Sequence, residues 1–362
     1  METLTRAQGA LYGLAIGDAL GMPAQMLSRA EIVRRWGLIL PGFEPAPPGH
    51  PMAAGLPAGT VTDDTEQAVL LAKLLVKGHG TVDPRELAEA LVDWERAMAE
   101  RGSLDLLGPS TKRAVAAILA GTPPEEAGAT GTTNGAAMRI APVGIAVDVI
   151  DSGTHLNPAT SLAPAPPTAQ NSLSTLVDHV VMASRVTHHT GIALAGAGAV
   201  AAAVSAGISG ATVAEATTLG VEAAHIAAGR GHWVAGADVA ARIEWATGLV
   251  AGRAEAEAAD LIYTLVGTSL ATQESVPAAF AVLAAVPGDP WLACRLAASV
   301  GGDCDTIAAM AGAIAGACHG AGSFPPEGIA VIDAQGLGLA ALAGELLALR
   351  GRPGSQARGA RS

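Results

Sequence analysis

Hydrophobic and polar positions follow a helical period along most of this chain. Apolar residues three and four positions apart lie on one face of a helix. The clearest segments of this kind are residues 66–77, 84–100, 112–120, 191–208, 213–229 and 306–318. Strand-like alternation is nearly missing, and Asn134-Gly135 is flanked by Ala and Met rather than by β-branched strands. Because helices and strands do not alternate, a doubly wound sheet is excluded and the pattern predicts an all-α helical bundle.

Glycines recur every fourth residue in two of these segments. A glycine inside a helix costs about 1 kcal/mol relative to alanine. Residues four apart share one helix face, so each row predicts a groove where another helix comes very close. The two rows are Gly9, Gly13, Gly17 and Gly21 near the start, and Gly312, Gly316 and Gly320 near the end.

The chain, 362 residues long, can bury a large core. Residues 41–57 are rich in Pro and Gly and predict a surface loop. Residues 152–172 predict a loop insertion between helices, or a lid. Neither stretch separates two cores, so residues 1–350 are interpreted as one domain. Residues 351–362, rich in Gly, Ser and Arg, predict a disordered tail.

Composition narrows the class of protein further. Hydrophobic residues make up 50% and charged residues 15%, which excludes a disordered chain. The formal net charge of −12 argues against nucleic acid and anionic membranes as partners. Residues 191–211 lack charge over a membrane-spanning length, but their Ala and Gly content predicts a buried helix of a soluble protein. Cys294, Cys304 and Cys318 are too few for a disulfide framework, which favours the cytoplasm.

Two acidic motifs carry the candidate chemistry. They read Thr62-Asp63-Asp64-Thr65 and Gly301-Gly302-Asp303-Cys304-Asp305-Thr306, each directly before a predicted helix. Helix capping is the simpler interpretation of such residues. A cap needs one oxygen, however, and each motif offers two carboxylates with a threonine hydroxyl. Four carboxylates in an apolar interior would repel one another without a cation, and an oxygen-only ligand set predicts two Mg²⁺ or Mn²⁺ ions sharing an activated water.

Five sequence blocks together resemble the ADP-ribosylglycohydrolase family, which includes the dinitrogenase reductase-activating glycohydrolases. They are GLAIGDALG at residues 13–21, the T-D-D-T motif, TNGAAMR at residues 133–139, Thr187-His188, and the G-G-D-x-D-T motif, in the family's order. The resemblance extends from about residue 4 to residue 320. It implies an all-α fold with a dinuclear Mg²⁺ or Mn²⁺ centre in a cleft. It also implies hydrolysis of a ribosyl C1″ bond, with the ribose diol docked on the ions.

The resemblance also implies roles for individual residues. Thr62, Asp63 and Asp64 would bind one ion, and Asp303, Asp305 and Thr306 the other, with Asp305 as the bridge. Asp64, Asp305 and Gln25 would be the catalytic residues. The loop Thr132, Thr133, Asn134 and Gly135 would cradle phosphate and ribose, a task suited to close backbone donors, and His188 would lie near the substrate. Without the family, this loop reads as an ordinary polar loop and His188 as a core or capping histidine.

Two departures from the family pattern fall on the substrate side. Gln25 stands where the family has a glutamate after the first helix. Glutamine can hold a water or bind a metal through its carbonyl, but it cannot take a proton. The family's Asp-Ile-Gly stretch reads Leu106-Leu107-Gly108 here, with Asp105 shifted by one position. We therefore expect a conserved hydrolytic core and an altered choice of substrate.

The leading hypothesis is a metal-dependent hydrolase that releases ADP-ribose from a modified protein or a small ribosyl conjugate. One alternative is a nucleoside-type N-ribohydrolase on the same dinuclear scaffold. Another is a non-catalytic ADP-ribose-binding module, because Gln25 is not a base; a membrane transporter is the most distant. The leaving group, the metal used in cells, the oligomeric state and the role of residues 152–172 are not set by the sequence.

Overall fold

The computed structural model describes residues 2–100, 107–149 and 167–350, and within these ranges it contains helices and two isolated β-bridges but no strand. The predicted all-α fold is confirmed. The longer helices are α1 (Glu2–Gly21), α2 (Arg29–Trp36), α3 (Asp63–Lys77), α4 (Pro84–Glu100), α5 (Pro109–Leu119), α9 (Pro167–Ser184), α10 (Gly191–Ile208), α11 (Val213–Ala228), α12 (Val239–Val250), α14 (Thr272–Ala285), α15 (Pro290–Ala297), α16 (Cys304–His319), α17 (Pro326–Asp333) and α18 (Leu339–Leu347). Shorter helical segments are α6 (Pro124–Ala127), α7 (Gly135–Met138), α8 (Ala141–Ala146), α13 (Glu255–Leu261), the π-helical η1 (Ile262–Val266) and the 3₁₀ turn η2 (Ala321–Ser323).

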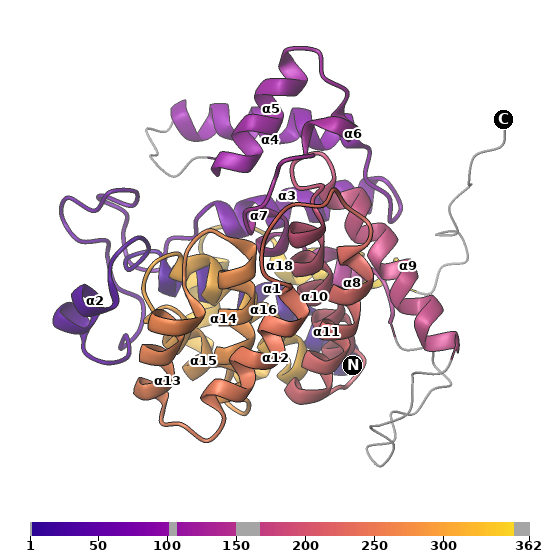
Figure 1. Ribbon diagram of the computed structural model, residues 1–362. Helices are drawn as coiled ribbons and strands as arrows, with labels where there is room; N and C mark the ends of the chain where they lie inside the picture. The colour runs from indigo at the N-terminus through magenta and orange to yellow at the C-terminus, as the bar shows by residue number, and fades with distance from the viewer. Residues whose placement is uncertain (1, 101–106, 150–166, 351–362) are drawn as a thin grey trace, which may run out of the picture.

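Helices α1 and α16 lie at the centre of the molecule (Figure 1). They run antiparallel in direct backbone contact, with Gly9 opposite Gly316 and Gly13 opposite Gly312. A Cβ atom added to Gly13 would lie 2.0 Å from the carbonyl oxygen of Gly312, and one added to Gly9 would lie 2.2 Å from that of Gly316. Side chains cannot fit between backbones this close. The predicted role of both glycine rows in close helix packing is therefore confirmed.

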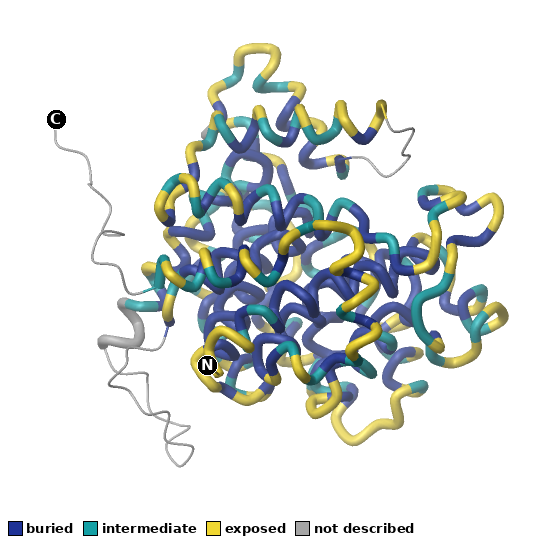
Figure 2. The backbone as a smooth tube through the Cα atoms, turned by 180° about the vertical axis from the view of Figure 1, so that it is seen from behind, coloured by how far each residue is buried: buried dark blue, intermediate teal, exposed yellow. Residues whose placement is uncertain are grey.

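Helix α10 packs beside this central pair and is covered by α11, α8 and α9. Among the described helices it alone is long and apolar enough to cross a membrane, and all of its residues in that window are buried inside the fold. Figure 2 shows the middle of the bundle in the colour of buried residues. The Ala and Gly content of α10 is thus that of a core helix packed close to its neighbours, as the sequence predicts.

The predicted helix boundaries needed correction at several places. Helix α5 begins at Pro109 rather than residue 112, and α9 begins at Pro167, inside the stretch predicted as a loop. The rest of the predicted insertion, up to residue 166, and the predicted tail lie outside the described residues. Residues 41–57 contain no helix, but Ala46, His50 and Ala53 are buried, so this loop folds onto the body instead of lying only on the surface.

The sequence analysis expected the two acidic motifs to precede their helices. In the structure these motifs instead form the first turns of the helices. Helix α3 starts at Asp63 and helix α16 at Cys304. Asp63, Asp64 and Asp305 therefore lie in the first turns. A negative side chain is favoured there by the helix dipole, and its direction is fixed by the helix backbone.

Candidate active site

Asp18 anchors the start of α3 from a different helix. This fully buried residue of α1 accepts hydrogen bonds from the backbone N–H of Thr62 at 2.9 Å and of Thr65 at 3.2 Å, and from the Thr62 hydroxyl at 2.6 Å. Thr62 itself makes no side-chain cap bond to α3, and Asp303 makes none to α16. Thr62 and Asp303 therefore do not act as side-chain caps of these helices.

Asp64, in the first turn of α3, has surroundings that are strongly unfavourable for a charged carboxylate. It is fully buried; its Oδ2 accepts a hydrogen bond from the Thr306 hydroxyl at 3.2 Å, but its Oδ1 has no partner among the described residues. Burial, first, and then the charges of Asp63, Asp305 and other nearby carboxylates raise the pKa of Asp64 well above its usual value. A cation would relieve both the burial cost and the repulsion.

Asp303 is held by the predicted substrate loop. The Asn134 side-chain amide donates to Asp303 Oδ2 at 2.5 Å and to the Ser275 hydroxyl of α14 at 3.0 Å. Burial raises the pKa of Asp303 to about 6, although the bonds from Asn134 and Thr306 work against this rise. Asn134 thus links the loop that the sequence analysis assigned to the substrate with the second acidic motif, which it assigned to the metal.

Two glycines before Asp303 permit a close approach of neighbouring chain segments. Gly301 has φ +89° and Gly302 has φ +67°, in the left-handed region that favours glycine. A Cβ on Gly302 would lie 2.3 Å from the carbonyl oxygen of Thr268. The backbone N–H of Met26 in turn donates to the Gly302 carbonyl, and Met26 itself has φ +60°. The turn after α1 and the start of α16 are therefore locked together, which places Gln25 and Asp305 on the same cavity.

Gln25 is held by its main chain and leaves its amide group available. The Gln25 carbonyl oxygen is bound by His50 Nε2 at 2.9 Å, and His50 Nδ1 accepts from the backbone N–H of Ala53 at 2.8 Å. Burial lowers the pKa of His50. The side-chain Nε2 of Gln25 is buried and has no partner among the described residues. The loop of residues 41–57 thus supports the turn that carries Gln25.

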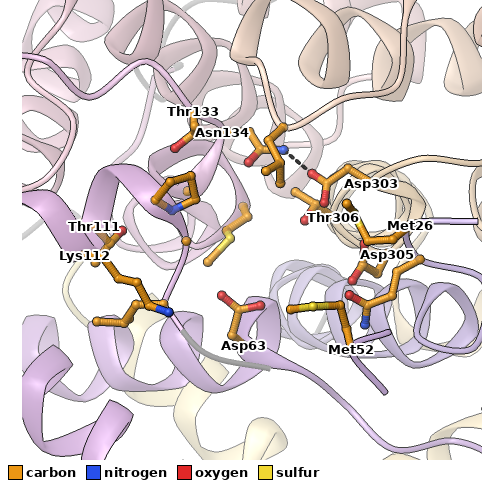
Figure 3. A pocket seen from close by; sticks show the side chains of 17 residues that line it. Met26, Met52, Asp63, Thr111, Lys112, Thr133, Asn134, Asp303, Asp305 and Thr306 are labelled. Atoms are coloured by element: carbon orange, nitrogen blue, oxygen red, sulfur yellow. Dashed lines mark hydrogen bonds between the residues drawn. The ribbon is translucent and has the colours of Figure 1, made fainter. Parts of the chain in front are cut away.

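These elements enclose one cavity of about 190 Å³. Figure 3 shows the labelled side chains pointing toward a common space, with Asp303 joined to Asn134. The lining residues are Gln25, Met26, Met52, Asp63, Leu107, Gly108, Pro109, Thr111, Lys112, Thr133, Asn134, Gly135, Met138, Leu270, Asp303, Asp305 and Thr306. The structure therefore brings most of the predicted site residues together.

Four predicted residues do not line this cavity. Thr62 and Asp64 lie behind it and bond to Asp18 and Thr306. Thr132 instead anchors its loop, because its carbonyl oxygen accepts from the Thr272 hydroxyl at 2.9 Å. His188 was expected near the substrate, but it is fully buried and does not line the cavity. It lies behind Thr133, with its Nε2 atom 3.0 Å from the Thr133 hydroxyl oxygen. The lack of a Cβ on Gly135 leaves room for its ring.

The side chains that surround Asp64 fit a hard cation by chemistry. Carboxylates and threonine hydroxyls are the oxygen donors that Mg²⁺ and Mn²⁺ prefer, and the Asp64 Oδ1 atom is buried without a hydrogen bond. As the side chains stand, no three His, Cys, Asp or Glu groups in the described ranges already converge as ligands of one ion. Ion binding by this cluster therefore remains a prediction.

Several residues of the site were missed by sequence reasoning. The sequence did contain a sign that Asp18 belongs to the site, because this charged residue interrupts an otherwise apolar helix with a glycine at every fourth position. His50 and Met52 lie in a loop whose sequence indicates no contact with the site. Lys112 places a half-exposed ammonium group at the mouth of an otherwise acidic cavity, where it also approaches Glu95 at 3.7 Å.

An all-α bundle with a cavity lined by carboxylates, threonine hydroxyls and a polar loop is the architecture of a glycosidic-bond hydrolase of the ADP-ribosyl type. The profile of the ADP-ribosylglycohydrolase family matches residues 1–356, and the chain belongs to this family of hydrolases. A solved structure titled "ADP-ribosylglycohydrolase-related protein complex" has the same fold, with a TM-score of 0.63, 24% identity, and coverage of 96% of this chain and 99% of that chain.

Three relatives of known sequence are similar to this chain, and two of them are named as hydrolases that act on ADP-ribosyl groups. The uncharacterized protein YegU of Escherichia coli is 35% identical over 91% of this chain and 92% of its own length. ADP-ribosyl-[dinitrogen reductase] glycohydrolase of Rhodospirillum rubrum is 31% identical over 39% of this chain and 44% of its length. ADP-ribosylarginine hydrolase Tri1 of Serratia proteamaculans is 33% identical over 40% of this chain and 37% of its length.

Proposed function

We propose that this protein is a divalent-ion-dependent hydrolase that releases ADP-ribose from a modified protein side chain or a small conjugate. The observation that carries the proposal is the buried carboxylate cluster around Asp64, whose Oδ1 atom has no hydrogen-bond partner within the ranges that the structure describes. Such a cluster is poorly stable alone and is well suited to Mg²⁺ or Mn²⁺. Relatives named as ADP-ribosylarginine and dinitrogen reductase glycohydrolases support the substrate class.

The residues divide into two groups in this proposal. Thr62, Asp63 and Asp64 would hold one ion, and Asp303, Asp305 and Thr306 the other. When bound, such ions supply a polarised water nucleophile, an anchor for the ribose hydroxyls, and charge balance for an oxocarbenium-like transition state. The chain's own contribution is to fix these carboxylates: Asp18 holds the first motif and Asn134 the second.

The substrate loop would orient the sugar and its phosphate. Asn134 and Gly135 line the cavity beside Asp303, and Thr133 presents its hydroxyl there. A volume of about 190 Å³ lies below the ~300–1,000 Å³ usual for small-molecule sites. The cavity thus suits one sugar ring, and the rest of a nucleotide would extend past Lys112 at its mouth.

The proposal is tested by incubating the protein with arginine-linked, serine-linked and phosphate-linked ADP-ribose and with nucleosides, with Mg²⁺, with Mn²⁺ and with a chelator. We expect release of ADP-ribose that the chelator abolishes and that Asp305→Asn lowers by at least 10²-fold, the usual scale for loss of a charge-stabilising group. Turnover unaffected by the chelator would contradict the dependence on ions.

Gln25 favours a second candidate, a nucleoside-type N-ribohydrolase. Gln25 lines the cavity with a buried amide nitrogen that has no hydrogen-bond partner in the described part of the chain, and it cannot act as a base. A small cavity also suits a nucleoside. We expect Gln25→Glu to shift the ratio of ADP-ribosyl to nucleoside hydrolysis toward the ADP-ribosyl substrates. An unchanged ratio would rule out Gln25 as a determinant of specificity.

A further inference from the structure

Arg139 is a buried cation that the proposed chemistry does not use. It follows α7 in the TNGAAMR block, is 1% exposed, and does not line the cavity. Its guanidinium donates to the Gln67 side-chain oxygen at 3.1 Å and to the Thr187 hydroxyl at 2.6 Å. It therefore lies between α3, which carries the first acidic motif, and the segment before α10 that carries Thr187.

The first of these contacts fixes the orientation of the Gln67 amide. A guanidinium can only donate hydrogen bonds, so the Gln67 atom that faces Arg139 must be its oxygen. The amide nitrogen is then turned toward Asp63 and donates to its Oδ2 at 2.8 Å. Arg139 thereby fixes, through Gln67, that an amide nitrogen rather than an amide oxygen faces Asp63.

The second contact fixes the direction of a longer hydrogen-bond chain. The Thr187 oxygen accepts from Arg139, and its single hydroxyl hydrogen faces His188 Nδ1 at 2.7 Å, against 3.5 Å to the Ser184 carbonyl oxygen. The shorter distance favours donation of this hydrogen to Nδ1, which is then unprotonated. A neutral imidazole carries its hydrogen on the other nitrogen, so His188 Nε2 donates to Thr133 Oγ1 across 3.0 Å.

The surroundings of His188 are consistent with a neutral ring. Burial, followed by the charges of Arg139 and Arg113, lowers the pKa of His188 well below its usual value. The ring is enclosed behind Gly135 and shares no surface with solvent. Its hydrogen-bond partners, rather than bulk pH, then decide which nitrogen carries the hydrogen.

We propose that Arg139 is a positioning residue that acts through Thr187 and His188 to turn the Thr133 hydroxyl into a hydrogen-bond donor directed at the cavity. Because the Thr133 oxygen already accepts from His188, its own hydrogen is available for the ligand. This wall of the cavity therefore selects an acceptor atom, such as a phosphate or ring oxygen, and disfavours a donor. This inference rests on the proposed function only for the identity of the ligand as a ribosyl phosphate.

The tautomer of His188 tests this inference without any turnover. We would record the ring ¹⁵N signals of uniformly His-labelled protein, with His188→Gln to assign the residue. The expected result is Nε2–H with a bare Nδ1 in the natural protein, loss of the single tautomer in Thr187→Val, and its recovery in Thr187→Ser. An Nδ1–H ring in the natural protein, or an unaltered tautomer in Thr187→Val, would overturn the proposal.

Kinetics on an ADP-ribosyl substrate give the second test. Loss of one hydrogen bond changes affinity by about tenfold. We expect Thr187→Val to raise KM by about that factor with kcat retained, and Thr187→Ser to restore KM. Thr217→Val is the matched control, since that hydroxyl bonds only to the Val213 carbonyl of its own helix at 2.8 Å among the contacts described. A changed kcat with an unchanged KM would overturn the inference, whereas failure to hydrolyse any substrate would affect the proposed function and leave the tautomer result standing.

Discussion

At the scale of a single residue, Asp64 is a buried carboxylate that lies close to other carboxylates and destabilises the fold. Its carboxylate is fully buried, and only one of its oxygens has a hydrogen-bond partner among the residues that the structure describes. A buried carboxylate of this kind is destabilising unless something compensates its charge. The fold therefore gives up stability at Asp64 to build the site.

Replacing Asp64 by Asn should stabilise the ion-free protein while it removes activity. Asn keeps the shape and can still accept the bond from Thr306, but it carries no charge to repel Asp63 and Asp305. We expect Tm to rise by several degrees without divalent ions, and the Tm gain on adding Mg²⁺ to vanish. Differential scanning fluorimetry measures both, and Glu345→Gln on the exposed side of α18 is the control that should change neither. A lower Tm for ion-free Asp64→Asn would contradict the repulsion.

The meeting of the two acidic motifs at one cavity could be predicted from the sequence, but the contacts that support them could not. Paired carboxylates beside threonines predicted a cluster of oxygen ligands. The structure brings Asp63, Asp303 and Asp305 to one cavity. His188 was predicted to approach the substrate and instead lies behind Thr133. Its position depends on a ring fitting behind a glycine from a distant segment, and single-sequence patterns carry no information about such contacts.

At the scale of elements, the close pairing of α1 and α16 explains why glycines are tolerated inside both helices. Each glycine weakens its own helix, yet only a hydrogen in place of a side chain lets the backbones meet. Gly21 continues this contact into the site, because a Cβ there would lie 2.3 Å from Asp305 Cα. The same glycine row thus packs the core and positions a candidate catalytic residue.

Gly13→Ala should destabilise the protein although alanine is the better helix former. The new methyl would meet the carbonyl oxygen of Gly312 at 2.0 Å, a backbone atom that cannot move alone. Overpacking of this kind costs roughly 1–3 kcal/mol or more. Gly248→Ala in α12 is the matched control: nothing lies within 4 Å of its added Cβ, so it should stabilise by up to about 1 kcal/mol. Urea unfolding of both variants measures these changes, and equal effects would refute the packing argument.

The helix ends were harder to predict than the helices themselves. The periodic pattern located residues 84–100 and 191–208 as the structure has them. It began α3 at residue 66 instead of Asp63, because the first turn of α3 is polar and its N–H groups are capped by Asp18 of α1. A cap supplied by another helix is a tertiary contact, and no local pattern indicates it.

At the scale of the whole molecule, the acidic cluster couples ion binding to stability and to pH. Burial raises the pKa of both Asp18 and Asp303 to about 6, against 3.8 for a free side chain. The ion-free folded protein therefore retains protons on these groups below about pH 6, where the unfolded chain has already released them. An ion held by Asp303 must displace the proton of Asp303 in order to bind, so its apparent affinity decreases as pH falls through 6.

We accordingly expect the rise in Tm caused by Mg²⁺ to be full at pH 7 to 8 and to shrink below about pH 6. An ion present at 100 times its Kd adds about 2.7 kcal/mol to the free energy of unfolding. His50 and His188, whose pKa values are lowered, weaken the fold on acidification in both samples, so the difference with and without Mg²⁺ cancels their effect. Thermal scans from pH 5 to 8 measure this difference; a gain that stays constant across the range would argue against proton displacement.

The pairing of α1 with α16 also fixes the order in which a newly made chain can acquire its activity. Residues 22–303 separate α1 from its partner α16, so a chain emerging from the ribosome exposes the α1 groove until α16 has been made. Contacts so remote along the chain form slowly, and incomplete chains present sticky surfaces. Fragments that end before α16 should accordingly lack Asp305 and aggregate, because the helix that covers the α1 groove also carries this part of the acidic cluster.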